Sequence, residues 1–323
     1  MLLQQCPDSP GGSCQNSVVQ TLDGGQTWSA NTKAGPPFAH GDGDAPRAIH
    51  FLNRSDGFVY GHEAAYVTHD GGITWTHINL PAVFVSSVAG RGNVAWAVTY
   101  PCAKGQACPY EVRSSLDGGH TWSSPHSLPD DFSPLDAVPF GTMGLLVPSF
   151  ATPLVNFGDM VITSDGGATW RLIKSACTST TASVDYVTTS DGRELWQLCT
   201  DFPSQAETNM VLFVSEDGGV SWSQRATSQS GGSLPHMVGG LVSIGPHTAF
   251  MITTGILVTR DAGLSWAQVA PAPSSGQNPS SFGAIRFANG TDGWALDSAQ
   301  TIWATIDGGA HWTPVPTYSG GNH

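Results

Sequence analysis

The segment SLDGGHTWSS, residues 115–124, places an aspartate, two glycines and a tryptophan in a fixed order. The pattern of its first eight residues recurs along the chain. The seven copies span residues 21–28, 68–75, 115–122, 163–170, 215–222, 259–266 and 305–312. Successive copies lie 47, 47, 48, 52, 44 and 46 residues apart, counted between Asp23, Asp70, Asp117, Asp165, Asp217, Asp261 and Asp307. A period of roughly 40–50 residues is that of a four-stranded propeller blade. The chain is therefore a repeat protein.

Each copy has the composition of a hairpin turn that leads into a strand. Asp-Gly is a strong hairpin signal because glycine adopts positive φ without a Cβ clash. The aspartate can accept hydrogen bonds from N–H groups of its own turn, and the tryptophan offers a large apolar surface. One copy has Ala262 in place of the first glycine, which indicates that the second glycine, Gly263 there, most needs backbone freedom. Calcium ligation and acid catalysis are alternative roles for the aspartates, but seven equivalent turns cannot all line one site. We interpret them as structural.

One repeat is clearest in residues 48–81 and 284–316. Their first strands are AIHF and AIRF, their second FVYG and WALD, their third AYVT and TIWAT, and the aspartate turn leads into a fourth. Trp96 and Trp196 fall in the second strands of other repeats, and no stretch shows the apolar period of a helix. We predict an all-β, seven-bladed β-propeller as a single domain over residues 1–323. Blade one is expected to be partial, so either upstream residues were removed or the ring closes with a three-stranded blade.

Charge and hydropathy exclude several partners. The chain has 25 acidic and 12 basic residues, a formal net charge of −13 and no basic cluster. Nucleic acids and anionic membrane surfaces attract basic surfaces, so neither is expected as a partner. No apolar run approaches the roughly 18 residues that indicate a transmembrane helix, and residues 1–6 (MLLQQC) lack the basic and apolar regions of a signal peptide. We therefore interpret residue 1 as the start of a shortened sequence.

The six cysteines fall into local pairs. Two pairs occupy equivalent loops, because Cys14 and Cys108 each precede the aspartate of a repeat by nine residues. We predict three disulfides, Cys6–Cys14, Cys102–Cys108 and Cys177–Cys199, the last between neighbouring strands of blade five. A metal site is the alternative, but C-x5-C and C-x7-C lack the usual zinc spacing. Local pairing of an even number favours an exported protein, extracellular or periplasmic.

The phrase Ser/Thr-x-Asp-x-Gly-x-Thr/Ser-Trp, between a third and a fourth strand, resembles the Asp-box or BNR repeat. This repeat occurs in sialidases, sortilin-type receptors, xyloglucan-hydrolysing endoglucanases and photosystem II assembly-factor-like proteins. The resemblance covers essentially the whole chain, and the pattern T-x-DGG-x-TW of blades two and seven is most similar to the assembly-factor-like group. It implies that the Asp boxes share one face and that ligands use the opposite face, formed by the loops between strands four and one and between strands two and three.

Loops expected on that opposite face contain the candidate site residues. The longest includes HGDGD, in which carboxylates suit a hard cation; its residues are His40, Asp42 and Asp44. The spacing is not that of an EF-hand loop, and a solvated turn is the simpler interpretation. An acidic loop with Asp130, Asp131 and Asp136 offers an acid and a base for glycoside hydrolysis, if their separation fits. Four aromatic residues would stack on sugar rings or else fill the core: Tyr100, Tyr110, Phe132 and Phe202.

No convergent acid–base or nucleophile constellation stands out. This favours an exported, non-catalytic binding or assembly scaffold that acts as a monomer without a cofactor and takes a protein or carbohydrate ligand on the loop face. The alternatives are a glycoside hydrolase of the xyloglucanase or sialidase-like type and a carbohydrate-binding lectin. Xyloglucan-active propellers usually pair two propellers around a cleft, and the Arg-x-Pro phrase of sialidases is missing ahead of the first box. An enzyme should present two carboxylates about 5–10 Å apart, a lectin exposed aromatics, and a scaffold an apolar patch.

Overall fold

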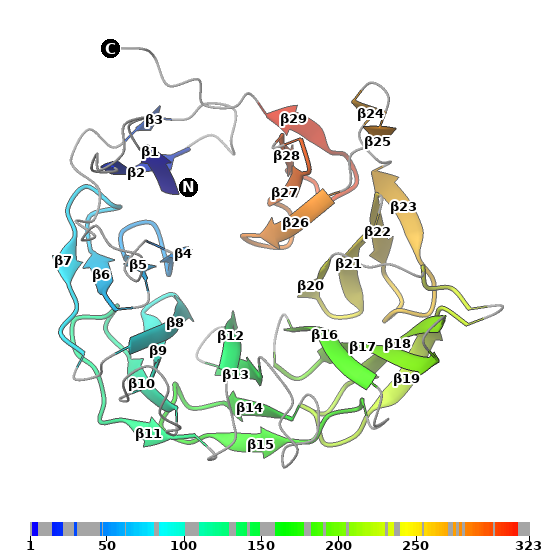
Figure 1. The fold of residues 1–323 in the computed structure, drawn as a ribbon, viewed down its shortest axis with the longest axis horizontal. Coiled ribbons are helices and arrows are strands. Elements are labelled where there is room, and N and C mark those ends of the chain that lie inside the picture. Colours follow the sequence, from blue (N-terminus) through cyan, green and yellow to red (C-terminus); the bar gives the residue numbers. More distant parts are fainter. Residues whose placement is uncertain are drawn as a thin grey trace. The chain divides into compact units, whose positions relative to one another are not determined.

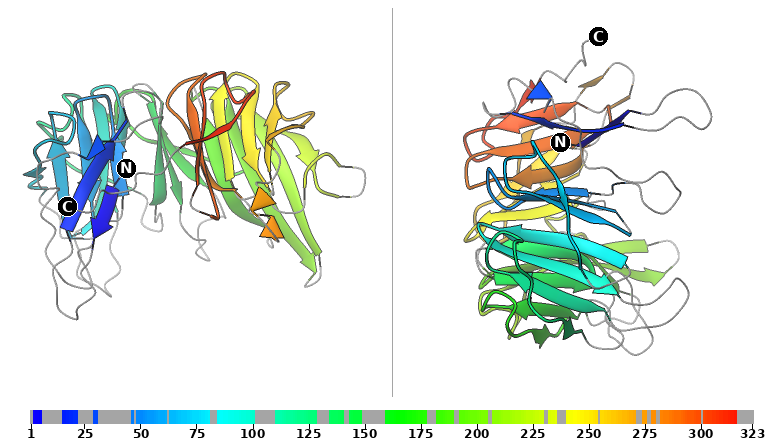
Figure 2. Two further views of the ribbon diagram at one scale, coloured as in Figure 1. Left: turned by 90° about the horizontal axis from the view of Figure 1, so that it is seen from above. Right: turned by 90° about the vertical axis from the view of Figure 1, so that its left-hand side faces the viewer.

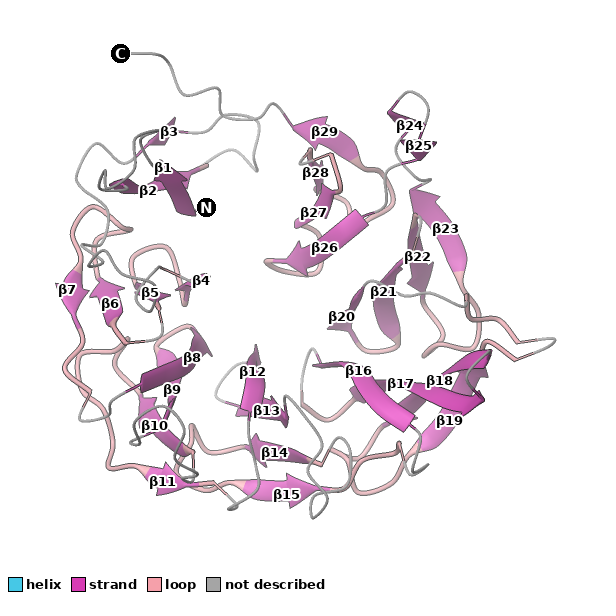
Figure 3. Cartoon of the chain, viewed as in Figure 1, coloured by secondary structure: helices cyan, strands magenta, loops and turns pink. Residues whose placement is uncertain are grey.

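The computed structural model describes residues 2–5, 15–21, 29–30, 46, 48–61, 63–80, 84–100, 110–128, 134–140, 143–148, 159–177, 182–189, 192–204, 207–229, 232–235, 240–253, 255–270, 274–275, 278–279, 282–299 and 301–315. All regular elements in these residues are β-strands (Figure 3). The chain divides into two compact units, residues 1–20 with 29–173 and residues 21–28 with 174–323. The predicted all-β class is confirmed.

The first unit contains four antiparallel sheets in chain order (Figure 1). The first sheet has three strands, β1 (Leu2–Gln5), β2 (Gln15–Gln20) and β3 (Ser29–Ala30). The second has β4 (Ala48–Phe51), β5 (Gly57–Tyr60), β6 (Ala65–Thr68) and β7 (Thr76–His77). The third has β8 (Phe84–Arg91), β9 (Val94–Tyr100), β10 (Glu111–Ser115) and β11 (His126–Ser127). The fourth has β12 (Pro134–Phe140), β13 (Met143–Pro148), β14 (Met160–Thr163) and β15 (Arg171–Ile173).

The second unit contains three four-stranded sheets and one hairpin. The first sheet has β16 (Ala182–Thr189), β17 (Leu195–Ser204), β18 (Glu207–Ser215) and β19 (Ser223–Thr227). The next has β20 (Gly240–Gly245), β21 (Thr248–Ile252), β22 (Ile256–Thr259) and β23 (Ala267–Ala270). The hairpin pairs β24 (Ser274–Ser275) with β25 (Asn278–Pro279). The last sheet has β26 (Phe282–Phe287), β27 (Gly293–Asp297), β28 (Ile302–Thr305) and β29 (Thr313–Val315).

Within each unit, successive sheets meet through their first strands. Strand β8 contacts β4 and β12 in the first unit, and β20 contacts β16 and β26 in the second. Figure 2 shows the same sheets from two further directions, with strands of neighbouring sheets in each unit side by side. These four-stranded meanders are the blades that the repeat period predicts. Six of these sheets have four strands in the described residues, and the sheet β1–β3 has three.

The strand register defines two edges of each blade. Strands β9 and β10 pair from Ala95–Ser115 at one end to Thr99–Glu111 at the other. The turn between the first two strands lies at the same end as the Asp box, because Gly118 N donates to Asn93 O. Gly308 N donates to Thr291 O at the corresponding place in the last blade. We call this end of each blade the box edge and the opposite end the loop edge.

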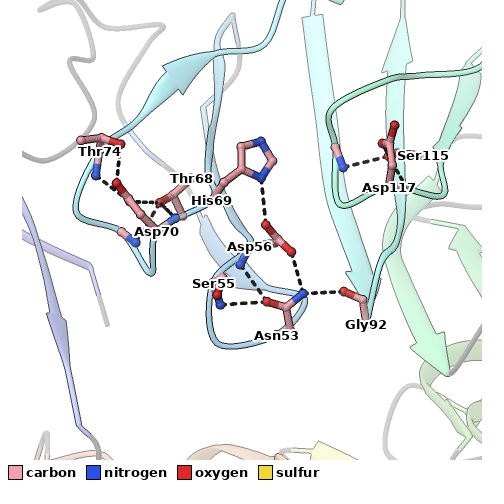
Figure 4. Close-up of polar contacts among 12 residues, drawn as sticks. Asn53, Ser55, Asp56, Thr68, His69, Asp70, Thr74, Gly92, Ser115 and Asp117 are labelled. Atoms are coloured by element: carbon pink, nitrogen blue, oxygen red, sulfur yellow. Dashed lines mark hydrogen bonds and ion pairs between the residues drawn. The ribbon is translucent and has the colours of Figure 1, made fainter.

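The described Asp boxes are held by hydrogen bonds of their own residues, as Figure 4 shows for the box at residues 68–75. In the box at residues 68–75, the Thr68 hydroxyl donates to Asp70 Oδ1 over 2.8 Å and accepts from Gly72 N over 2.8 Å. Asp70 also accepts from Thr74, at Oδ1 from the backbone N–H (2.8 Å) and at Oδ2 from the hydroxyl (2.6 Å). The same four bonds recur in the boxes of Asp117, Asp165, Asp217 and Asp261. The box of Asp307 has the first three of them, and Nδ1 of His311 takes the place of the hydroxyl at Asp307 Oδ2. These carboxylates therefore shape their turns. Asp23 lies outside the described residues.

The two glycines of a box have different constraints. Both positions adopt positive φ, and Ala262 adopts it too, at 59°. Backbone freedom therefore does not single out the second glycine, contrary to the expectation from sequence. Space does: a Cβ on Gly263 would lie 2.6 Å from Leu212 and 3.2 Å from the Trp196 ring, both in the preceding blade. The second glycine is required because another blade occupies the position of its side chain.

The same contact joins other pairs of blades. The second glycines Gly119, Gly167 and Gly309 would place a Cβ 2.7, 2.7 and 2.4 Å from Phe58, Trp96 and Phe250, respectively. These aromatic side chains are fully buried in second strands of preceding blades. The tryptophan of each box packs edge-on against the same ring, at centroid distances of 5.9 Å for Trp122–Phe58, 6.3 Å for Trp170–Trp96 and 6.5 Å for Trp312–Phe250. The box therefore fixes one blade to the preceding one.

A disulfide joins Cys177 to Cys199, as predicted. Cys199 is on β17, but Cys177 lies in the connection between β15 and β16 rather than on a strand. Both are buried and pack against Phe213. The bridge therefore ties the entry of this blade to its second strand. The predicted pairs Cys6–Cys14 and Cys102–Cys108 lie outside the described residues.

We expect Gly263→Ala to lower the free energy of unfolding by about 2–5 kcal/mol, because the added Cβ overlaps a packed blade in a backbone conformation unfavourable to alanine. The matched control is Ala262→Gly, at the neighbouring position with positive φ. Its effect is expected to stay within about 1 kcal/mol, since relief of strain is offset by a more flexible unfolded chain and a lost buried methyl group. Urea unfolding compares the two variants. Equal losses in both would contradict the packing explanation.

The box carboxylates also make stability depend on pH. The hydrogen bond from the hydroxyl at the seventh box position is the main cause that lowers the aspartate pKa to about 2 in three boxes, those of Asp165, Asp217 and Asp261. A carboxyl group whose pKa is lower in the folded state stabilises the fold above its unfolded pKa. This stabilisation is lost as the pH falls through the folded pKa.

We therefore expect Asp165→Asn to lower the urea midpoint at pH 6, and the difference from the unsubstituted protein to narrow from about pH 4 towards pH 2. Urea unfolding at pH 6, 4, 3 and 2 tests this. Glu63→Gln, at an exposed carboxylate outside the boxes, is the control and should give parallel curves. A difference for Asp165→Asn that is constant over the whole range would show that its charge does not stabilise the box.

Candidate functional site

The described part of the loop edge contains a cluster of three aromatic side chains in the blade β8–β11. Tyr100 ends β9 and Tyr110 immediately precedes β10, at the end of these strands away from the Asp box. Phe84 begins β8 and pairs with Tyr100 in the sheet register. The hairpin geometry thus brings three aromatic residues to one edge. We call Phe84, Tyr100 and Tyr110 the aromatic cluster.

The rings of the aromatic cluster contact one another in sequence. Phe84 stacks on Tyr100 with centroids 5.0 Å apart, and Tyr100 lies 5.2 Å from Tyr110 at an interplanar angle of 53°. Phe84 is buried, whereas both tyrosines are half-buried. Tyr110 packs against the core between the third and fourth blades and accepts a hydrogen bond at its carbonyl from Leu128 N. The cluster is therefore a rigid aromatic surface, partly open to solvent, suited to stacking and apolar contact.

Two of the remaining candidates lie on described strands. Asp136 lies on β12 opposite Val147, next to a β-bulge, and Phe202 lies on β17. The other candidates lie outside the described residues: His40, Asp42, Asp44, Asp130, Asp131 and Phe132. Tyr100 and Tyr110 are two predicted site residues whose rings the structure brings into contact.

A second polar site lies at the box edge, where no functional residue was predicted. Asp56, in the turn between β4 and β5, accepts from His69 Nδ1 at 2.8 Å and from Asn53 Nδ2 at 2.8 Å (Figure 4). His69 stacks on His120 of the next box, with centroids 3.7 Å apart and planes 9° apart. Burial raises the pKa of Asp56, but the hydrogen bonds from Asn53 and His69 and the two imidazoles outweigh it and leave the pKa low. The signal in the sequence was a histidine within each of two consecutive boxes.

Two buried carboxylates outside the boxes are fully engaged. Glu194 accepts from Trp196 Nε1 (2.9 Å), from His247 N (2.8 Å) and from His247 Nδ1 (2.8 Å). This contact links the turns of neighbouring blades at the box edge. Asp297 accepts from the backbone of its own turn and from Trp303 Nε1. Carboxylates so fully occupied by donors are structural rather than available for proton transfer.

In the described residues, no group of three or more His, Cys, Asp or Glu side chains is arranged to hold a metal ion. The same residues include no helix long and apolar enough to cross a membrane.

Comparison with known proteins supports the repeat and the fold. The family model for the BNR/Asp-box repeat matches residues 66–77, and no curated protein matches the sequence. Among solved structures, YCF48 bound to a D1 peptide is 19% identical, with a TM-score of 0.57 over 84% of this chain and 80% of that one. The β-propeller domain of the trilobed protease from Pyrococcus furiosus is 10% identical, with a TM-score of 0.61 over 98% and 92%.

The GH74 xyloglucanase from Xanthomonas campestris is 15% identical, with a TM-score of 0.57. The match covers 87% of this chain but 46% of the xyloglucanase. At such identities the likeness concerns the fold, which all three structures share with this chain. The chain is thus a β-propeller with BNR/Asp-box repeats, similar in fold to YCF48.

Proposed function

We propose that the protein is an exported, non-catalytic scaffold that binds a segment of another protein at the loop edge of its propeller. The observation that carries this proposal is the aromatic cluster. Phe84 is buried and supports Tyr100 and Tyr110, which are half-buried. Rigid tyrosines supply large contact area at a low entropic cost, which is why they are enriched where proteins bind one another.

The structural comparisons support a peptide rather than a polysaccharide as the ligand. This chain matches YCF48, a structure with a bound peptide, over most of both chains. It matches less than half of the xyloglucanase. The net charge of −13 favours a neutral or basic segment as the ligand.

The wider architecture belongs to the same proposal. Seven Asp boxes support seven blades in a single monomeric domain over residues 1–323, with the first blade partial. The buried Cys177–Cys199 disulfide supports export, since disulfides persist in oxidising compartments. No cofactor is proposed for the binding role.

The alternative is a glycoside hydrolase, which the likeness in fold to the xyloglucanase favours. Its acid and base would come from Asp130, Asp131 and Asp136. A lectin that uses the same tyrosines on a sugar ring lies between the two functions, because stacking alone does not distinguish a peptide from a carbohydrate.

The test is selection of peptides from a random peptide display library on the immobilised protein, followed by affinity measurement for the selected peptides. We expect Tyr110→Leu to weaken binding about two- to tenfold, because it removes an aromatic contact worth about 0.5–1.5 kcal/mol while keeping an apolar side chain. Val220→Ser, at an exposed side chain on the box edge, is the matched control and should leave the affinity unchanged.

A second assay separates the alternatives. Release of reducing sugar from xyloglucan or other β-glucans, abolished by Asp→Asn at position 130, 131 or 136, would replace the scaffold proposal with the hydrolase. Selected peptides that bind Tyr110→Leu as tightly as the unsubstituted protein would move the binding site away from the aromatic cluster.

A further inference from the structure

The histidines of two consecutive boxes depart from the pattern of the other described boxes. His69 occupies the second box position, where the others have Leu116, Ser164, Glu216, Arg260 and Ile306. His120 occupies the sixth box position, where the others have Ile73, Ala168, Val220, Leu264 and Ala310. The turn accepts widely different side chains at both positions. Imidazoles are therefore not needed for the box itself, and their pairing calls for another explanation.

The surroundings of His69 fix which of its ring nitrogens is available. Its Nδ1 lies 2.8 Å from Asp56 Oδ1, and Asp56 is oriented by Asn53, whose Nδ2 also donates to Gly92 O over 2.7 Å. An ionised carboxylate accepts hydrogen bonds only, so Nδ1 carries a proton, and in the neutral imidazole the lone pair is on Nε2. A carboxylate behind an imidazole is the arrangement that typically orients histidine ligands of metal ions.

His120 supplies a second imidazole with freedom to move. Its side chain is exposed, and its ring contact in the described residues is the stack on His69. Both residues belong to the first unit, one in the second blade and one in the third. In the stacked arrangement the ring nitrogens do not converge on one point. The proposed site requires the exposed His120 side chain to rotate so that one of its ring nitrogens turns towards Nε2 of His69.

We propose that His69 and His120 form a two-imidazole site for a divalent transition-metal ion such as Zn²⁺, with Asp56 as the positioning residue behind His69. Imidazole nitrogen suits Zn²⁺, Cu²⁺ and Ni²⁺, whereas Ca²⁺ and Mg²⁺ require oxygen ligands. The nearby carboxylates of Asp70 and Asp117 are occupied by donors of their own boxes. Because no group of three ligands is arranged in the described residues, water completes the coordination.

An ion held in this way connects the second and third blades at the box edge. Each imidazole comes from a different box, and the ion binds the assembled pair better than it binds an unfolded chain. Binding therefore stabilises the folded state by mass action, in proportion to the logarithm of the ion concentration over the dissociation constant.

The experiment is titration of the full chain, prepared without a polyhistidine tag, with ZnCl2 by isothermal calorimetry. We expect one tight equivalent, and an affinity at least about tenfold lower for His120→Ala, a change that the box tolerates because Ala168 and Ala310 occupy the same position elsewhere. Asp56→Asn is expected to lower the affinity about 10–100-fold, as loss of an outer carboxylate typically does. Electron paramagnetic resonance with one equivalent of Cu²⁺ should show two coordinated nitrogens, and one in His120→Ala.

The matched control is His311→Thr. His311 is an exposed imidazole that also contacts a box carboxylate, Asp307, at 2.7 Å, and threonine is the residue at this position in other boxes. This variant should bind Zn²⁺ like the unsubstituted protein. Unfolding midpoints without metal show whether each variant folds. If His120→Ala does not fold, His69→Ser is the second variant, since Ser164 occupies that position in another box. Equal Zn²⁺ affinity of the protein with and without one of these histidines, or the same Cu²⁺ spectrum for both, would overturn the proposal.

Discussion

The contact on which the fold depends lies between the second glycine of an Asp box and a buried aromatic ring of the preceding blade, as at Gly119, Gly167 and Gly309. At Gly167 and Gly309 there is no room for a Cβ, because the Trp96 and Phe250 rings already fill that space. The tryptophan of the same box packs edge-on against the same ring. A single turn therefore forms the hairpin of one blade and also packs against the core of the preceding blade. This explains why the box recurs with so little variation along the chain.

Because this contact lies at the box edge, the two edges of each blade have different roles. At the box edge, turns bind their own backbone and that of the neighbouring blade, as in the contact of Glu194 with His247. Substitution there is tolerated at the exposed second and sixth box positions, which point away from the packed glycine. The loop edge has no repeated motif, and its side chains are free to differ between blades. The aromatic cluster lies at this edge, where Tyr110 packs against the core between the third and fourth blades.

The repeat made the fold predictable, since its turn chemistry is local. Hydrogen bonds within residues 68–75 involve partners at most four positions apart, and such bonds follow from sequence alone. The strand positions of Trp96 and Trp196 followed from the period. The reason for the second glycine did not, because Leu212 and Gly263 are far apart in sequence and meet through packing between blades. Cys177 lies in the connection between β15 and β16 and not on a strand as predicted. The path of such a connection does not follow from the amino-acid composition.

The candidate sites were less predictable for the same reason. Tyr100 and Tyr110 stand out singly in the sequence, but their approach to Phe84 depends on the register of three strands. His69 and His120 are visible in the sequence as residues of two boxes, and only the stacking of one box on the next brings them into contact. Local turn chemistry is the opposite case, because Asn53 favours a turn by its residue type alone. Its Oδ1 accepts from the backbone N–H groups of the two residues that complete that turn.

The state of the carboxylates also bears on whether this propeller can be catalytic. A general acid for glycoside hydrolysis needs a pKa raised towards neutrality, which requires burial without donors. The box aspartates have the reverse environment, with several donors each and a lowered pKa. Glu194 and Asp297 are buried, but each accepts hydrogen bonds from a tryptophan and from backbone N–H groups. The box aspartates, with their lowered pKa values, are thus unsuited to act as the general acid. A scaffold that binds its ligand through tyrosines requires no catalytic carboxylates in addition to those that stabilise the fold.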